Sequence, residues 1–328
     1  MTVALLLLGL ALLVVGGELL VRGAVRTAEC FDVSPLLIGL TLVGFGTSMP
    51  ELVTSVQAAL IGSPGIAVGN IVGSNIANVL LILGSAALIM PIAVESRALR
   101  RDGAFVVAVT TLFAAVAYTV GLIRPVGVLF AALLVAYLVY AYRQERKHET
   151  GHTAAYERAE ARAAVDPALQ PGRRPRRPLP AVAGPLALAI AGLVIVVVGG
   201  RVLVDAAVDL ARLVGLSEEV IGLTIVAIGT SAPELVTSLV AAMRRQPDVA
   251  IGNVLGSNIY NLLGIGGLTA LIAPTPVPEQ IAGVDAPFML GVSVLMVFFA
   301  WTEKSVSRVE GAVFLAFYIG YLWFLLAR

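Results

Sequence analysis

Two glutamates, Glu51 and Glu234, lie in the middle of long apolar stretches, and each ends the motif Gly-Thr-Ser-x-Pro-Glu. An ionised carboxylate that faced lipid at that depth would cost at least several kcal/mol, so each glutamate needs a bound cation or a proton. Packing alone does not explain such a costly residue. We therefore predict that both carboxylates belong to a cation-binding site.

Hydroxyl and amide side chains accompany each glutamate at helical spacing. Thr47 and Glu51 are one helical turn apart and share a face, and Ser74 and Asn78 share a face for the same reason. These four side chains can point at one spot. A second copy of the motifs supplies equivalent groups, and the predicted site also contains Ser48, Thr230, Ser231, Glu234, Ser257 and Asn261.

The predicted ligands are oxygen atoms, with no His or Cys among them. Such hard ligands suit Ca²⁺ and Na⁺, whereas Zn²⁺ or Cu⁺ would favour imidazole or thiolate groups. One Ca²⁺ cancels the charge of both glutamates, while Na⁺ must bind in multiples to do so, which makes the two ions natural competitors. Pro50 and Pro233 should break their helices, and we expect the breaks to free backbone carbonyls near Gly44 and Ala227 as further ligands.

A packing role competes with the functional interpretation for the smaller residues. Glycines in membrane helices often allow close packing, and the pairs Gly69/Gly73 and Gly252/Gly256 have the small-xxx-small spacing that serves it. Glu18, which occurs in the first copy alone, is expected near an interface. Four further asparagines look like residues that bond backbone groups or neighbouring helices, and we leave them outside the site: Asn70, Asn75, Asn253 and Asn258.

Both motifs belong to a long internal repeat. Residues 16–84 align without a gap on residues 199–267 at a constant offset of 183 (234 − 51), with about half of the positions identical. Each copy is expected to contain five spans, and an odd number makes the second copy enter the membrane from the opposite side. Inverted repeats with interrupted helices at matching positions are typical of transporters whose substrate site lies near the bilayer midplane.

The composition indicates a membrane protein. Hydrophobic residues make up 59% of the 328 residues and charged residues 13%, unlike a soluble globule. The first repeat should cover residues 1–142 with its motif region at 39–84, and the second residues 181–328 with its motif region at 222–267. At about 20 residues per span, we expect an all-α protein with ten transmembrane helices near 2–21, 36–61, 65–90, 103–121, 125–142, 181–203, 219–243, 248–273, 285–301 and 309–327.

Residues 143–180, between the repeats, are rich in Arg, Glu, Ala and Pro and too polar to cross a membrane. We expect a solvated basic linker that holds the orientation through its charge, with a regulatory or lipid-headgroup role as the alternative. With this linker in the cytoplasm, both termini of the protein face outward from the cell (inner) membrane. The basic residues of three other loops then also lie inside, as the positive-inside rule requires: Arg97, Arg100, Arg101, Arg244, Arg245, Lys304 and Arg308.

Gly-Thr-Ser-x-Pro-Glu followed by Gly-Ser-Asn-Ile-x-Asn, present twice, resembles the paired alpha-repeats of the sodium/calcium exchanger (cation/calcium antiporter) superfamily. The resemblance implies that Glu51 and Glu234, with oxygens of Thr47 and Thr230, coordinate Ca²⁺. It also implies that the first and sixth spans slide past a rigid core of the other helices. The Na⁺ sites implied around the Ca²⁺ site are completed by Ser48, Ser74, Asn78, Ser231, Ser257 and Asn261.

One residue departs from part of that family. Some prokaryotic relatives have an aspartate where this chain has Asn261, so the predicted site has one titratable group fewer. This departure speaks against proton coupling and leaves the stoichiometry open, and the resemblance extends to other exchangers of the superfamily that have asparagine in both repeats.

The expected function is secondary antiport of Na⁺ against Ca²⁺ by alternating access, and not an enzymatic reaction. H⁺/Ca²⁺ antiport in the same fold and, less favoured, a passive cation channel are the alternatives. The sequence lacks a Gly-x-x-x-x-Gly-Lys-Ser/Thr loop, which argues against an ATP-driven pump. We expect Ca²⁺ and Na⁺ as substrates and the lipid bilayer as surroundings, without a cofactor, nucleic acid or protein partner.

Overall fold

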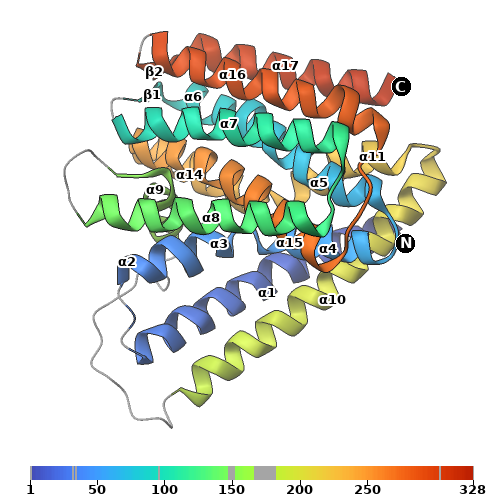
Figure 1. Cartoon of the computed structure of the whole chain (residues 1–328), viewed down its shortest axis with the longest axis horizontal. Coiled ribbons are helices and arrows are strands. Elements are labelled where there is room, and N and C mark those ends of the chain that lie inside the picture. The colour runs from blue at the N-terminus through green and yellow to red at the C-terminus, as the bar shows by residue number, and fades with distance from the viewer. Residues whose placement is uncertain are drawn as a thin grey trace.

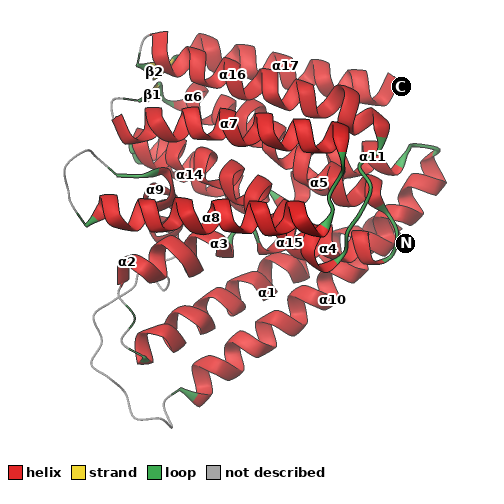
Figure 2. Cartoon of the chain, viewed as in Figure 1, coloured by secondary structure: helices red, strands yellow, loops and turns green. Residues whose placement is uncertain are grey.

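The computed structural model describes residues 2–31, 33, 35–94, 97–146, 152–165, 182–302 and 304–327, which form a helical bundle (Figure 1, Figure 2). The first half contains α1 (Thr2–Cys30), α2 (Pro35–Ile38), the π-helical segment η1 (Gly39–Val43), α3 (Gly44–Gly46), α4 (Met49–Leu60), α5 (Pro64–Ala77), η2 (Asn78–Leu83), α6 (Gly84–Ile89), β1 (Ile92–Ala93), α7 (Arg97–Thr119) and α8 (Arg124–Glu145). After α9 (Ala154–Val165), the second half contains α10 (Ala183–Val214), α11 (Glu218–Ile221), η5 (Gly222–Val226), α12 (Ala227–Thr230), α13 (Ala232–Met243), α14 (Pro247–Ile259), η6 (Tyr260–Ile265), α15 (Gly266–Ile272), η7 (Ile281–Asp285), α16 (Ala286–Thr302), β2 (Ser305–Val306) and α17 (Arg308–Ala327).

The long apolar helices agree with a membrane-spanning bundle. Within the described residues, 8 helices are long and apolar enough to cross a membrane, and a ninth span results if the bent pair 218–230 and 232–243 is taken as one. The corresponding pair of the first half, α2 to α4, is where a tenth would lie. The all-α membrane fold is therefore confirmed, and the number of ten spans stays a prediction.

Both motif helices are interrupted at the predicted positions. Thr47 and Ser48 separate α3 from α4, and Ser231 separates α12 from α13, with φ and ψ of −84° and 6° at Ser48 and −83° and 8° at Ser231. Pro50 and Pro233 follow in the first turns of α4 and α13, where a proline lacks no helical hydrogen bond. The second break bends the chain by 49°.

The first helices of the two repeats, α1 and α10, lie side by side (Figure 1). Glycines bring them close: a Cβ added to Gly9 would lie 2.7 Å from the backbone nitrogen of Leu203, and one added to Gly16 would lie 2.7 Å from that of Val196. The later glycine of α1, Gly16, meets the earlier residue of α10, Val196, so the two helices run antiparallel. This direction is the one that inverted repeats require, and the inversion is thereby confirmed.

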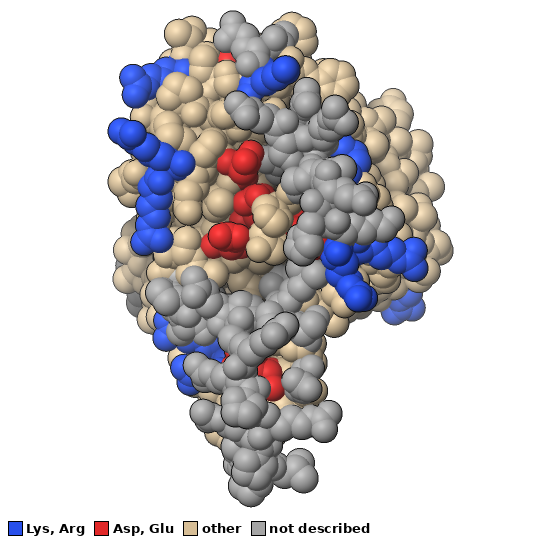
Figure 3. Space-filling view, turned by 90° about the vertical axis from the view of Figure 1, so that its left-hand side faces the viewer, with Lys and Arg blue, Asp and Glu red and all other residues tan. Residues whose placement is uncertain are grey.

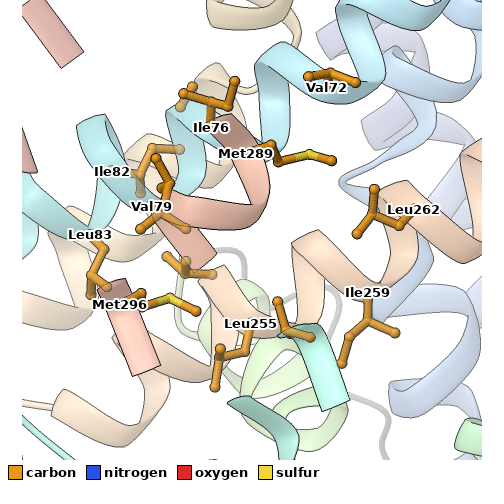
Figure 4. Packing of buried hydrophobic residues seen from close by; sticks show 14 of the residues in the cluster. Val72, Ile76, Val79, Ile82, Leu83, Leu255, Ile259, Leu262, Met289 and Met296 are labelled. Atoms are coloured by element: carbon orange, nitrogen blue, oxygen red, sulfur yellow. The ribbon is translucent and has the colours of Figure 1, made fainter. Parts of the chain in front are cut away.

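The motif-bearing helices form the centre of the bundle. The most apolar part of the continuous segment 64–89 is 94% buried inside the protein, and that of segment 247–272 is 83% buried. The corresponding parts of α1, α8 and α17 are 28% buried. Figure 4 shows how the two segments pack with α16, with Val72, Ile76 and Val79 on one segment and Leu255 and Ile259 on the other. The remaining apolar surface of the outer helices is available to lipid.

Short backbone pairings tie loops together at the two ends of the bundle. Ile92 pairs with Val306 in the β1–β2 ladder, and Leu122 pairs with Thr275 at the opposite end. Figure 3 views the end with the ladder, where Lys and Arg side chains lie around the face and Asp and Glu side chains nearer its middle. The loops predicted to share a side thus share an end, while which end is cytoplasmic stays a prediction.

The interpretation of the whole 143–180 stretch as a solvated linker is wrong for residues 154–165. These residues form α9, which is packed against α14, η1 and α13. Its alanines are small enough for close packing, and Ala154, Ala155 and Ala161 are at most 1% exposed. Residues 147–151 and 166–181 lie outside the described residues, so the prediction for them is untested.

Candidate ion-binding site

The helix breaks place the two glutamates at equivalent positions. Glu51 and Glu234 lie in the first turns of α4 and α13 and are 1% and 2% exposed. A helix N-terminus carries a partial positive charge, which favours a carboxylate there. Both carboxylates are therefore buried inside the protein and not directed into lipid.

Two asparagines fix the backbone on which the glutamates sit. Asn70 donates to the carbonyl oxygen of Glu51 at 3.0 Å and to Ser55 Oγ at 2.9 Å. Asn253, which is 183 positions later, donates to the carbonyl of Glu234 at 3.2 Å and to Ser238 Oγ at 2.8 Å. The prediction that these asparagines serve backbone and interhelical bonding is confirmed.

Side chains of the two repeats bond directly to one another at the breaks. Ser231 donates to Glu51 Oε1 at 3.0 Å, so the second break reaches the glutamate of the first. Ser48 donates to Asn261 Oδ1 at 3.2 Å in the opposite direction. Further bonds join Thr230 to Asn70 Oδ1 at 3.0 Å and Asn78 to Asn258 Oδ1 at 2.9 Å. The structure thus brings predicted ligands from both repeats into one network.

Several oxygens of the predicted site are buried without a hydrogen-bond partner among the described residues. They are Glu51 Oε2, Glu234 Oε2, Ser74 Oγ and Asn78 Oδ1. Buried polar atoms without partners are uncommon in proteins because desolvation penalises them. Oxygens left in this state on two carboxylates, a hydroxyl and an amide fit coordination of a hard cation such as Ca²⁺ or Na⁺.

Three other predicted ligands, Ser257, Ala227 and Gly44, are not among these unpartnered oxygens. Ser257 Oγ donates to the carbonyl of Asn253 at 2.7 Å, which leaves the lone pairs of the hydroxyl available. The Ala227 carbonyl is not freed by the break, since it accepts a bond from the Ser231 backbone at 3.1 Å, and the Thr230 hydroxyl, which donates to Asn70 Oδ1, lies 3.3 Å from it. The expectation that the break frees this carbonyl is wrong, and its role as a ligand stays a prediction. Gly44 is buried at the start of α3, and its role stays a prediction.

The π-helical segments are a feature that the sequence analysis missed. Asn78 begins η2, and Asn261 is the second residue of η6. A π turn adds a residue to the helical turn and so rotates the side chains that follow, and such segments are frequent at functional sites. They place both asparagines of the motifs within the central network.

An arginine from the linker also lies in the site. Arg158 of α9 is fully buried, and its Nη2 contacts the Thr47 hydroxyl, donates to Ser48 Oγ at 2.7 Å and pairs with Glu234 Oε1 at 3.2 Å. The guanidinium also lies over the ring of Tyr260, 5.1 Å from its centroid. Three predicted ligands of the cation site therefore bind a cationic side chain instead.

Sequence reasoning missed Arg158 and Tyr260. The Ala-rich stretch 154–165 favours a helix, and its small residues could have indicated close packing. Arg158 itself is one of many arginines in a polar segment, and nothing local distinguishes it from the others. Its partners are more than 70 positions away in the sequence, so only the fold reveals them.

Polar contacts hold α9 along its length. The carboxylate of Asp102 accepts a bond from the Ala154 backbone at 2.7 Å, which caps the N-terminus of the helix. Glu145 accepts from the Thr153 backbone and is joined to His152 at 2.7 Å. Further along, the helix is held by the ion pair between Arg162 and Glu18 and by the bond from Arg244 to the Ala164 carbonyl at 2.9 Å.

Docking of α9 should weaken as pH rises. Burial raises the pKa of Glu157 to about 7, with His152, Asp248, Glu160 and Glu145 as the charged groups near it. Burial alone would lower the pKa of His152, but its bond to Glu145 raises it. Because the pKa of each group is higher when α9 is docked than when it is free, the docked state binds more protons. Protonation of Glu157 and His152 therefore favours docking at low pH. Between pH 6 and pH 8 we expect docking to weaken about tenfold.

Thiol labelling can measure this change. In a Cys30→Ala background, an Ala161→Cys thiol is buried when α9 is docked, since Ala161 is 1% exposed, whereas a thiol at the exposed neighbour Glu160 reports intrinsic reactivity. The ratio of the two labelling rates should rise from pH 6 to pH 8. Adding Glu157→Gln should remove most of that rise, and an unchanged pH profile in this variant would contradict the assignment.

The inverted repeats, the broken helices and the buried oxygen network define a helical membrane transporter for cations. The profile of the family described as "Sodium/calcium exchanger protein" matches residues 1–143 and 184–327. The chain therefore belongs to the sodium/calcium exchanger family, whose members are antiporters and not enzymes. α9 lies between the two matched stretches.

Individual relatives agree along nearly the whole chain. The chain is 36% identical over 336 residues to the sodium/calcium exchanger MaX1 of Methanosarcina acetivorans, covering 97% of this chain and 96% of that protein. It is 35% identical over 304 residues to the inner membrane protein YrbG of Escherichia coli, covering 92% and 89%. A solved structure of the sodium-calcium exchanger NCX_Mj matches with a TM-score of 0.60 and 33% identity, covering 97% of this chain and 96% of that one.

Proposed function

We propose that the protein exchanges Na⁺ for Ca²⁺ across the membrane by alternating access. The observation that carries this proposal is the pair of buried glutamates, one from each inverted repeat, with Ser231 of the second break bonded to Glu51 of the first and hydroxyl and amide oxygens in the same network. Two carboxylates match the charge of one Ca²⁺, and neutral oxygens suit Na⁺ ions that replace it. Competition for one site, combined with alternating exposure to each side, gives counter-transport.

The packing of α1 and α10 supports the moving part of the proposal. These helices contact each other along glycine-containing faces and are much less buried than the central helices. Sliding of the pair past the core would change access to the site while the ligands on α4, α5, α13 and α14 keep their arrangement. The solved NCX_Mj structure concerns a protein described as a sodium-calcium exchanger, which agrees with these substrates.

The coupling ion is tested by imposing each gradient separately. Purified protein in proteoliposomes should take up Ca²⁺ when Na⁺ is higher inside the vesicles, because Na⁺ leaving down its gradient drives the exchange. A pH gradient without Na⁺ should have little effect, since the neutral hydroxyl and amide oxygens around the two glutamates suit Na⁺, and Asn78 and Asn261 add no further titratable group. Uptake that follows the pH gradient would show H⁺/Ca²⁺ antiport, and uptake that ignores both gradients would show a passive channel.

A further inference from the structure

Arg158 breaks the symmetry of the site. Ser231 bonds to Glu51 Oε1, and the repeat would place an equivalent bond between Ser48 and Glu234. In the structure both of these residues bind Arg158 instead. The guanidinium therefore occupies the position where the second half of the site would complete its own network.

A second hydrogen bond, between a threonine and an asparagine, is present in one half of the site and absent from the other. Thr230 donates to Asn70 Oδ1, whereas its repeat equivalent Thr47 contacts Arg158. Asn253 Oδ1, the equivalent acceptor, has no hydrogen-bond partner among the described residues. Both differences between the halves therefore coincide with the position of Arg158.

The backbone of α9 also takes the place of a helix contact between the repeats. Gly69 and Gly73 of α5 lie against the backbone of Leu223, in the π-helical segment of the other repeat. Their equivalents on α14 face α9: a Cβ on Gly252 would overlap the Cβ of Glu157, and one on Gly256 would lie 3.0 Å from Arg158 Cδ. α9 contacts both α14 and η1, so it lies where η1 and α3 would otherwise approach α14.

The fit of the guanidinium is incomplete. Nε and Nη1 of Arg158 are buried without a hydrogen-bond partner among the described residues, while Nη2 makes all the contacts with Thr47, Ser48 and Glu234. Unsatisfied buried donors weaken the docked state. An arginine that served only to stabilise the fold would be expected to satisfy more of its donors. Partial satisfaction suits a side chain that can be displaced.

We propose that α9 is an autoinhibitory plug, in which Arg158 acts as a tethered cation that competes with the transported ion for Glu234, Thr47 and Ser48. This proposal rests on the proposed function, because it assigns a regulator to the same ion site. While α9 is docked, one of the two glutamate charges is neutralised by a group that cannot be transported. Release of α9 is then required before Ca²⁺ or Na⁺ binds, and high concentrations of either ion favour release.

Removal of the tethered cation is the first test. In proteoliposomes with a Na⁺ gradient and subsaturating Ca²⁺, Arg158→Ala should increase the uptake rate about tenfold or more, because a plug that leaves a tenth of the molecules competent lowers apparent affinity by that factor. Arg158→Lys keeps the charge and should stay closer to wild type. Arg146→Ala, at an exposed arginine after α8, is the matched control and should not activate.

A second variant displaces α9 without changing Arg158 or a predicted ligand. Gly252→Ala introduces a methyl group where Glu157 packs, so it should activate uptake as Arg158→Ala does. Gly291→Ala is its control, because a Cβ there meets nothing within 4 Å. Activation by both displacing variants and neither control supports the plug, whereas equal uptake by wild type, Arg158→Ala and Gly252→Ala would overturn it.

Thiol labelling separates failure of the plug from failure of the proposed function. Ca²⁺ or Na⁺ should increase labelling of Ala161→Cys in the Cys30→Ala background, and Arg158→Ala should make labelling fast without added ions. Labelling that no ion changes would overturn competition at the site. Absence of uptake in every variant under every gradient would contradict the proposed function, and the labelling result would still decide whether Arg158 competes with cations.

Discussion

Glu51→Gln is expected to lose Ca²⁺ uptake by a factor of about 100 or more. The substitution keeps the size and one oxygen of the side chain but removes a charge from the pair that faces the ion. Removing one opposite-charge partner of a buried ion costs about 3–5 kcal/mol, which is between two and four orders of magnitude in binding. Uptake at a fixed Na⁺ gradient measures the loss, with Glu279→Gln at an exposed position as the control.

The variant should still insert and fold, because a neutral amide is less costly to bury than a carboxylate. Its thermal unfolding in detergent, measured without Ca²⁺, provides that check. Uptake of Glu51→Gln within a few fold of wild type would remove Glu51 from the site.

Glu234→Gln is expected to release α9, and Glu51→Gln is not. The two glutamates are equivalent in sequence, yet only Glu234 pairs with Arg158, at 3.2 Å. Losing that partner should shift the docking equilibrium by between two and four orders of magnitude, since it leaves a buried guanidinium uncompensated at a cost of about 3–5 kcal/mol. In the Cys30→Ala background, labelling of Ala161→Cys should become fast in Glu234→Gln.

Glu51→Gln serves as the matched control for this asymmetry, because it makes the same chemical change at the repeat-related position. Its labelling should change far less, although Glu51 also attracts Arg158 from a distance. Both variants should lose Ca²⁺ transport, so uptake alone would not distinguish them. Equal labelling rates in the two variants would contradict the assigned pairing of Arg158.

The symmetry of the protein explains why the two predictions differ. A duplicated sequence gives two copies of each ligand, and the inverted repeat places the two copies at related positions. The linker occurs once and therefore supplies α9 to one half only. Labelling of α9 should therefore respond differently to the same substitution at Glu51 and at Glu234, although the two residues are equivalent in the repeat.

Much of the site could be predicted from the sequence, because its chemistry is local. The cost of burying a carboxylate in a membrane indicated Glu51 and Glu234, and one-turn spacing indicated Ser74 with Asn78. Proline located both helix breaks, since its missing donor is a property of the residue itself. The duplication then placed the two sets in one network without knowledge of any contact.

Tertiary structure alone decided where residues 154–165 lie. Their polar composition suggested a solvated segment, but the free energy of an arginine depends on its partners, and those of Arg158 come from the break between α3 and α4 and from α13. The same holds for Ala227, whose carbonyl stays bonded to the Ser231 backbone because Ala227 begins the short helix α12 and the break follows at Ser231. The sequence determined the fold class and predicted the ligand chemistry, because both follow from residue type and spacing. Long-range packing determined that Arg158 pairs with Glu234, because no local sequence pattern indicates which cationic group contacts a buried carboxylate.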